Sequence, residues 1–191
     1  MDRGALDFFK TAEQYVKTNF NNELLNVEHR RFENQNTDDF LRQYIYVVLN
    51  SGMKNQVAKK IFQRFLDSGF DLNIIGHPSK KKAIAQAILR YKGWFEKLKA
   101  SNDKVRYLDT LPWIGEITKY HLARNLGIDC AKPDRHLVKL AKYFGYPSVQ
   151  QMCEDISKES GYRVGTVDAI LWRYCNMHHP IVNSLFHHPT S

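Results

Sequence analysis

Apolar residues recur three and four positions apart along almost the whole chain, and this periodicity restricts the fold more than any other feature of the sequence. Such spacing places the apolar side chains on one face of an α-helix. No segment shows the sustained two-residue alternation that is typical of a half-buried strand, and no internal repeat or low-complexity stretch occurs. The sequence therefore predicts an all-α fold.

Capping residues and apolar stripes indicate where the expected helices begin and end. Ala5 to Phe20 forms the first of them. Thr37 is the expected N-cap of the second, which has apolar residues on nearly every side and is therefore expected to be buried. Ser51-Gly52 ends it. Two further helices are expected, one near residues 57–69 and one at 80–99 with Ser79 as its N-cap. A short helix is expected to end at Leu108, and the next to span residues 116–125. Asp134 is the expected N-cap of the helix after that, and the last two are expected near residues 148–157 and 164–176.

Length and cysteine content narrow the class of protein. A chain of 191 residues can bury a substantial core. Its three cysteines (Cys130, Cys153 and Cys175) are too scattered for a disulfide framework. The N-terminus has no signal-peptide pattern, and the longest apolar run, residues 44–49, is too short to span a membrane. We therefore expect a cytoplasmic protein that does not enter a membrane, or a nuclear one if its source is eukaryotic.

The chain is basic, with 28 Lys and Arg against 20 Asp and Glu and a formal net charge of +8. This charge fits a polyanionic partner such as nucleic acid, and it also fits a solvated basic surface without a partner. Lys80, Lys81 and Lys82 stand at the expected start of a helix, where lysines oppose the helix dipole. Their position favours contact with phosphate.

The segment from Leu111 to His136, LPWIGEITKYHLARNLGIDCAKPDRH, carries most of the functional information. A short helix leads into a Leu-Pro-x-x-Gly hairpin, and a second helix follows. A tight turn that opens a helix presents backbone N–H groups at the positive end of the helix dipole, which suits a phosphate. Gly115 allows the close approach of a backbone. We expect this phosphate to be surrounded by Trp113, Ile114, Gly115 and Thr118.

Asp134 follows Gly115 by 19 residues and is the one carboxylate that we expect to act in chemistry. A fixed carboxylate stabilises positive charge that develops on a sugar when a glycosidic bond breaks. Taken singly, Pro-Asp before an amphipathic helix is an ordinary N-cap, and Leu-Pro-x-x-Gly is an ordinary turn. Their occurrence together, at this spacing and followed by His136, favours a functional site.

Three segments together resemble the helix-hairpin-helix DNA glycosylases. LPWIGEIT is similar to the Leu-Pro-Gly-x-Gly hairpin of that family, and KPDRHL to the motif that carries its catalytic aspartate. FLRQYIYVVLNSGMKNQVAKKIF resembles its early helix pair, where a loop residue enters the gap left by a flipped base. The resemblance covers residues 37–144. It implies that Asp134 is catalytic and that further DNA contacts come from Met53, Asn55, Gln56 and Lys82.

The resemblance also implies an architecture and an activity. It implies a single glycosylase domain over residues 1–191, with a DNA cleft between two helical subdomains, the helix-hairpin-helix at about 104–126 and the aspartate loop at 128–136. Such a protein binds double-stranded DNA as a monomer, flips out a damaged or modified base and hydrolyses the N-glycosidic bond. The bases of alkylated, oxidised, deaminated or phage-modified DNA all remain open as substrates, with a tilt towards cationic alkylpurines.

Three residue positions depart from the family pattern. Trp113 replaces the first hairpin glycine, and we expect it to fill core or to stack on DNA. Ile117 stands where members with lyase activity carry a nucleophilic lysine, so no Schiff base forms there and a monofunctional enzyme is expected. Lys119 and Lys132 are the remaining amines that could supply lyase activity. The dispersed cysteines cannot build a four-cysteine iron–sulfur cluster, so we expect no cofactor.

Two other functions stay open. One is a bifunctional glycosylase/lyase acting on oxidised purines of the 8-oxoguanine type, and the other is a non-catalytic helix-hairpin-helix module that only binds DNA. Asp168 is expected to act either in the first turn of the last helix or at the cleft. Base stacking or core packing is expected of Tyr44, Trp94, Phe144 and Trp172. No metal is expected, because zinc-finger spacing is absent from Cys175, His178, His179, His187 and His188.

Overall fold

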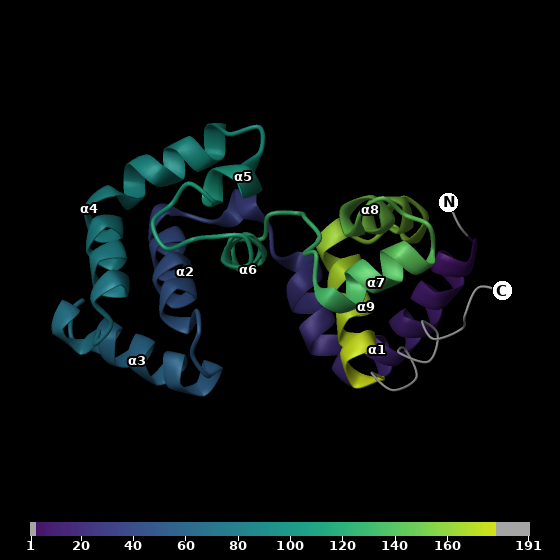
Figure 1. Cartoon of the computed structure of the whole chain (residues 1–191), viewed down its shortest axis with the longest axis horizontal. Coiled ribbons are helices and arrows are strands. Elements are labelled where there is room, and N and C mark those ends of the chain that lie inside the picture. Colours follow the sequence, from purple (N-terminus) through teal and green to yellow (C-terminus); the bar gives the residue numbers. More distant parts are fainter. Residues whose placement is uncertain (1–2, 179–191) are drawn as a thin grey trace. The chain divides into compact units, whose positions relative to one another are not determined.

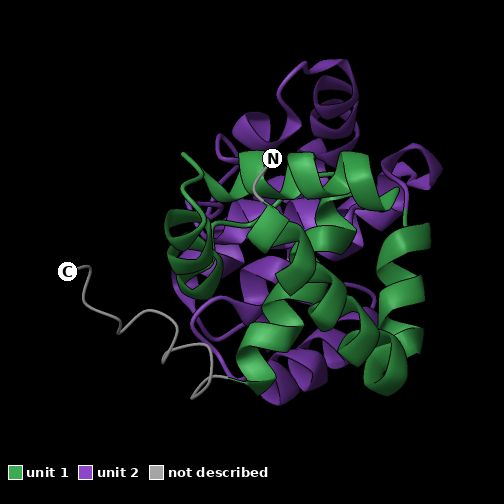
Figure 2. Cartoon of the chain, turned by 90° about the vertical axis from the view of Figure 1, so that its right-hand side faces the viewer, with its two compact units in different colours: residues 1–30, 129–191 green, residues 31–128 purple. Residues whose placement is uncertain are grey.

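The computed structural model describes residues 3–178, and every regular element within them is a helix (Figure 1). The prediction of an all-α fold is therefore confirmed. The chain divides into two compact units, one made of residues 1–30 and 129–191 and the other of residues 31–128 (Figure 2). No helix in the described range is long and apolar enough to cross a membrane. The single glycosylase domain over the whole chain stays a prediction.

The unit of residues 31–128 is built around one buried helix, α2 (Thr37–Asn50), which packs against three others. These are α3 (Asn55–Asp67), α4 (Pro78–Ala100) and α6 (Thr118–Asn125). The short helices η1 (Phe32–Asn34), η2 (Leu72–Ile74) and α5 (Lys104–Leu108) complete the unit. Side chains on several sides of α2 are fully buried, as its apolar composition predicts: Phe40, Tyr44, Ile45, Val47 and Val48.

Two helices of this unit begin at other caps than the sequence predicts. Asn36, not Thr37, is the N-cap of α2: its side chain accepts from the amides of Asp38 and Asp39, and the Asp39 side chain accepts in turn from the Asn36 amide. This reciprocal capping box satisfies more amides than a single hydroxyl does. His77, not Ser79, is the N-cap of α4, because Pro78 fits the first helical position without losing a hydrogen bond.

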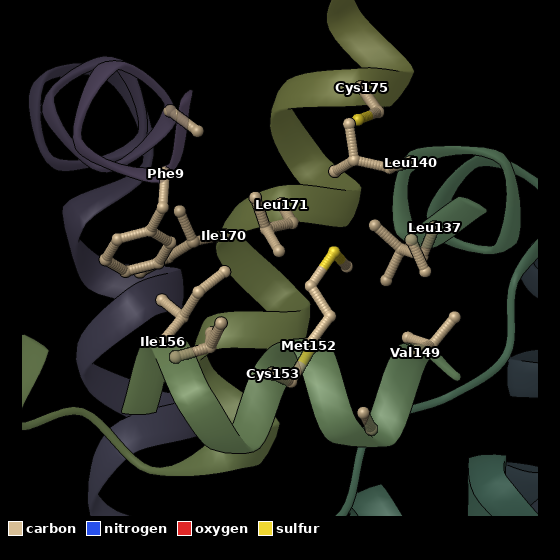
Figure 3. Close-up of a cluster of buried hydrophobic side chains, with 14 of the residues drawn as sticks. Phe9, Leu137, Leu140, Val149, Met152, Cys153, Ile156, Ile170, Leu171 and Cys175 are labelled. Carbon is tan, nitrogen blue, oxygen red and sulfur yellow. The ribbon is translucent and has the colours of Figure 1, made fainter. Parts of the chain in front are cut away.

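The other unit packs α9 (Val164–Met177) against α1 (Arg3–His29), α7 (Arg135–Tyr143) and α8 (Val149–Ser160). Figure 3 shows the apolar side chains that these helices direct into a shared core, among them Leu140 of α7 and Leu171 of α9. Cys153 and Cys175 belong to this core, and all three cysteines are free. Burial raises the pKa of the Cys175 thiol to about 12, with the nearby charge of Asp134 as a smaller cause.

Helix α1 is longer than the sequence predicts. It continues past Phe20, where the backbone leaves helical geometry (φ −139°, ψ 29°), and ends at His29. Arg173 of α9 holds this bend, because its guanidinium lies 4.8 Å from the centre of the Phe20 ring. The same guanidinium bonds the carboxylate of Glu23, one helical turn further, at 2.5 Å. A contact from α9 therefore fixes a segment that shows weak helical periodicity on its own.

Candidate active site

The hairpin between α5 and α6 is closed by short-range backbone bonds and by two buried side chains. The Leu111 amide donates to the carbonyl of Leu108 at 3.1 Å, and the Ile114 amide to that of Leu111 at 3.1 Å. Leu111 and Ile114 are 5% and 6% exposed, so they tie the turn to the core of its unit. Tyr44 of α2 adds a bond from its hydroxyl to the carbonyl of Pro112 at 2.5 Å.

The turn that leads into α6 has backbone N–H groups that no described residue accepts. Among residues 3–178, the amides of Glu116 and Ile117 have no hydrogen-bond acceptor. The Gly115 amide donates to the Thr118 hydroxyl at 2.8 Å. A Cβ added to Gly115 would meet nothing within 4 Å. The turn therefore has backbone donors of the kind that an anion needs.

Trp113 is not a core residue, although core packing was one expectation for it. Its side chain is 38% exposed, and its backbone is in the left-handed region at φ 65°. The indole Nε1 donates to Ser51 Oγ at 2.6 Å, and the indole ring meets the His77 ring edge-on at 5.1 Å. Trp113 therefore links the hairpin to the turn between α2 and α3 and to the start of α4.

Lys119 is held by two carboxylates of its own unit. Its Nζ lies 3.1 Å from Asp109 Oδ2 and 2.9 Å from Glu116 Oε2. The hydrogen bond to Glu116, with a smaller contribution from Asp109, raises the pKa of this amine above its usual value. A nucleophilic amine must be neutral, so these partners disfavour Lys119 as the centre of a Schiff base. Ile117, by contrast, is 71% exposed at the family's lysine position.

Met53, Asn55 and Gln56, from which DNA contacts are expected, lie where α2 ends and α3 begins. Met53 is half-buried in a turn closed by its amide and the Asn50 carbonyl, at 3.1 Å. Asn55 is exposed and accepts a hydrogen bond from the Tyr46 hydroxyl, while Gln56 is exposed on the first turn of α3. The structure places Met53 beside Ser51, which is the partner of Trp113, so the hairpin and this turn are adjacent.

The lysines that open α4 differ in their surroundings. Lys82 is exposed, as a residue that contacts phosphate must be. Lys80 is 5% exposed, and its Nζ donates to the carbonyls of Leu49 and Ser51 at 2.8 and 2.6 Å, which lowers its availability to DNA. Burial lowers the pKa of Lys80. Sequence reasoning missed this structural role, because the carbonyls at the end of α2 are about 30 residues away.

Asp134 lies in the other unit, where the structure shows its role as an N-cap. It is the N-cap of α7, and its Oδ1 accepts from the His136 amide at 2.9 Å. The side chain is half-buried, and within the described part of the chain its second carboxylate oxygen has no hydrogen-bond donor. The cap therefore orients the carboxylate and leaves one of its oxygens without a donor among the described residues.

The loop before Asp134 is held by side chains of α8 and α9. The amide of Lys132 donates to Asp168 Oδ1, and that of Ala131 to Gln150 Oε1, both at 2.9 Å. Asp168 is 3% exposed, so it acts inside its unit and not merely through the charge of a first helical turn. Gln150 carries no pattern in the sequence that would identify it.

No metal centre is found where the structure can be described: within residues 3–178 no group of three His, Cys, Asp or Glu side chains could hold a metal ion. Three histidines of the Cys- and His-containing C-terminal segment (His179, His187 and His188) lie outside the described residues. His178 lies inside them, between the rings of Tyr15 and Tyr174, at 4.4 and 4.3 Å between ring centres.

Comparison with solved structures identifies the fold. No protein-family model and no curated protein sequence matches the chain. The 8-oxoguanine glycosylase/lyase of Methanocaldococcus jannaschii, in complex with a 15mer DNA containing 8-oxoguanine, superposes with a TM-score of 0.64 at 16% identity, over 86% of this chain and 94% of that one. The 8-oxoguanine DNA glycosylase of Thermotoga maritima gives 0.63 at 16% identity, over 90% and 96%. The chain therefore has the same all-helical fold as these two 8-oxoguanine DNA glycosylases.

Proposed function

We propose that this protein is a DNA glycosylase that flips a damaged or modified base out of duplex DNA and hydrolyses its N-glycosidic bond, leaving an abasic site. The observation that carries the proposal is the carboxylate of Asp134, which is oriented by its bond to the His136 amide and keeps one oxygen unoccupied by any described residue. The glycosylase fold and the net charge of +8 support it.

DNA binding is proposed to begin at the hairpin. The amides of Glu116 and Ile117 and the hydroxyl of Thr118 would contact one phosphate, an interaction that positions the duplex without reading its sequence. Lys82 would add a charged contact to the backbone, and Met53, Asn55 and Gln56 would fill the space that the flipped base leaves. All of these residues belong to one chain, so the protein is proposed to bind DNA as a monomer.

Asp134 is proposed to stabilise the positive charge that develops at C1′ as the base leaves and to orient the attacking water. A carboxylate fixed before the reaction needs no reorganisation during it, and losing such a group typically costs about 10²-fold or more in rate. Water is proposed as the nucleophile, because Ile117 has no amine and Lys119 is paired with Asp109 and Glu116. The enzyme would then be monofunctional.

A bifunctional glycosylase/lyase that acts on 8-oxoguanine is the second candidate. The Methanocaldococcus protein of the same fold is described as a glycosylase/lyase, which favours it. In this chain Lys132 is two residues before Asp134 and would be the amine that forms the Schiff base. Borohydride reduction during the reaction distinguishes the two candidates: a covalent complex between protein and DNA supports the lyase and contradicts the monofunctional enzyme.

The proposed function is tested with Asp134→Asn. Purified protein is incubated with duplexes that each carry one lesion, 8-oxoguanine first, and alkali then cleaves the abasic sites. We expect excision by the wild type and a loss of about 10²-fold or more in the variant. Asp7→Asn, on the exposed surface of α1, is the matched control for loss of one negative charge and should remain active.

DNA affinity separates an enzyme from a module that only binds. Since the substitution Asp134→Asn removes one negative charge, the variant should bind duplex DNA as well as the wild type or more tightly. Excision that survives in Asp134→Asn contradicts the assigned role of the carboxylate. Absence of excision by the wild type from every damaged or modified duplex contradicts the glycosylase itself and leaves the binding module.

A further inference from the structure

We infer that Asp168 and Gln150 are positioning residues for Asp134, because they hold the backbone that places its carboxylate. The inference rests on the proposed function. Residues 129–134 contain no helix, yet they carry the group on which the chemistry depends. A catalytic group must keep its position to within about 0.5 Å, and a loop provides that only when other elements support it.

The stronger support comes from Asp168. Its Oδ1 accepts the Lys132 amide at 2.9 Å, two residues before Asp134. Asp168 lies in α9 and is 3% exposed. Burying a carboxylate is unfavourable unless it accepts hydrogen bonds. Asp168 therefore has a defined partner in the loop.

Gln150 supplies an independent contact from α8. Its Oε1 accepts the Ala131 amide at 2.9 Å, and its Nε2 donates to Glu154 Oε1 at 2.8 Å. The bond to Glu154 fixes which end of the side-chain amide faces the loop. Two consecutive loop amides, those of Ala131 and Lys132, are thus bonded to acceptors from two different helices.

The remainder of the loop is tied at both ends. At its start, Asp129 Oδ1 accepts the Gly165 amide of α9 at 2.8 Å. At its end, the Asp134 amide donates to the Lys132 carbonyl at 2.7 Å, which makes a tight turn around Pro133. The position of Asp134 relative to Lys132 is therefore fixed, so a displacement of Lys132 moves Asp134 as well.

The supporting helices are themselves held by the core that Figure 3 shows. Met152 of α8 and Leu171 of α9 are fully buried there together with Leu137 of α7, the helix that Asp134 caps. The loop is therefore bonded to elements that cannot shift independently of α7. Neither Asp168 nor Gln150 is placed at the reacting atoms, so both act through the position of Asp134.

The test compares Asp168→Ala, which removes the acceptor, with Asp168→Asn, which keeps an oxygen at the same place. We expect the single-turnover excision rate to fall about tenfold or more in Asp168→Ala, since displacement of a catalytic group by 1 Å can cost about 10²-fold. Asp168→Asn should stay within about threefold of the wild type, and the affinity of all variants for DNA should be unchanged. Asp155→Ala, a carboxylate on α8 that pairs with Lys158, is the control and should retain full activity.

Hydrogen exchange of the amides of residues 128–136 measures how well the loop is held in place, and it does not depend on enzymatic activity. We expect faster exchange in Asp168→Ala than in Asp168→Asn or the wild type. Gln150→Ala should show the same two effects, slower excision and faster exchange, and it serves as the test if Asp168→Ala fails to fold.

Unchanged excision in the alanine variants overturns the inference, as does an Asp168→Asn variant that is as slow as Asp168→Ala. Wild-type protein that excises nothing is a failure of the proposed function; the loop contacts are then judged by exchange alone, and unchanged exchange overturns them.

Discussion

At the scale of single residues, Asp134 combines an observed N-cap with the proposed catalytic role, and this makes it a favourable position for mutation. Asparagine is as good an N-cap as aspartate, so Asp134→Asn keeps the bond to the His136 amide and the start of α7. Alanine loses the cap and costs about 1 kcal/mol of stability as well as the charge. The asparagine variant therefore reports on the carboxylate and not on folding.

Thr118 is the polar side chain at the mouth of the hairpin, and its contribution to DNA binding can be predicted. Its hydroxyl accepts from the Gly115 amide and lies 3.3 Å from the Gly115 carbonyl, to which it can donate. Thr118→Ala removes this group, and we expect a Kd for duplex DNA about fivefold higher, equivalent to about 1 kcal/mol. Thr118→Ser keeps the hydroxyl and should bind like the wild type. Fluorescence anisotropy measures both, and equal affinity of the alanine variant excludes a contact between the Thr118 hydroxyl and the phosphate.

At the scale of helices, local sequence patterns predict that a helix exists better than they predict where it begins and ends. The burial of α2 follows from its composition, and the start of α7 follows from Asp134 as N-cap. The continuation of α1 to His29 does not, because Arg173 of α9 fixes the bend at Phe20 from far along the chain. Where part of a helix depends on a contact between residues far apart in the sequence, local patterns do not predict that part.

Trp113 links the hairpin to the end of α2 and the start of α4, and this link leads to a prediction about the stability of the protein. A non-glycine residue at φ 65° costs about 1 kcal/mol, and the contacts of the indole with Ser51 and His77 offset it. Trp113→Ala keeps the strain and loses the contacts, whereas Trp113→Gly loses both. We expect the alanine variant to be the less stable by about 1 kcal/mol, as measured by urea unfolding. Equal stability of the two variants would show that the positive φ carries no cost.

At the scale of the whole molecule, the parts of the site differ in how far the sequence predicts them. The hairpin and Asp134 are contained in one short segment, residues 111–136, so their occurrence together could be used to predict a phosphate anchor and a catalytic carboxylate. Gln150 and Asp168 lie 19 and 36 residues from the amides that they hold. No local pattern connects residues so far apart, and only packing of α7, α8 and α9 brings them to the loop.

The basic charge is a property of the whole molecule, and the salt dependence of binding separates its contribution from that of the hairpin. Lysine contacts release counterions from DNA, with a slope of log K against log salt of about −0.9 per phosphate neutralised, whereas neutral amides and hydroxyls release none. Lys82→Ala should therefore make the slope shallower by about 1, while Thr118→Ala weakens binding at every salt concentration and leaves the slope unchanged. Titrations between about 50 and 200 mM salt measure both slopes. An unchanged slope in Lys82→Ala would mean that the exposed lysine at the start of α4 faces solvent, and that the charge of +8 acts on DNA through other residues.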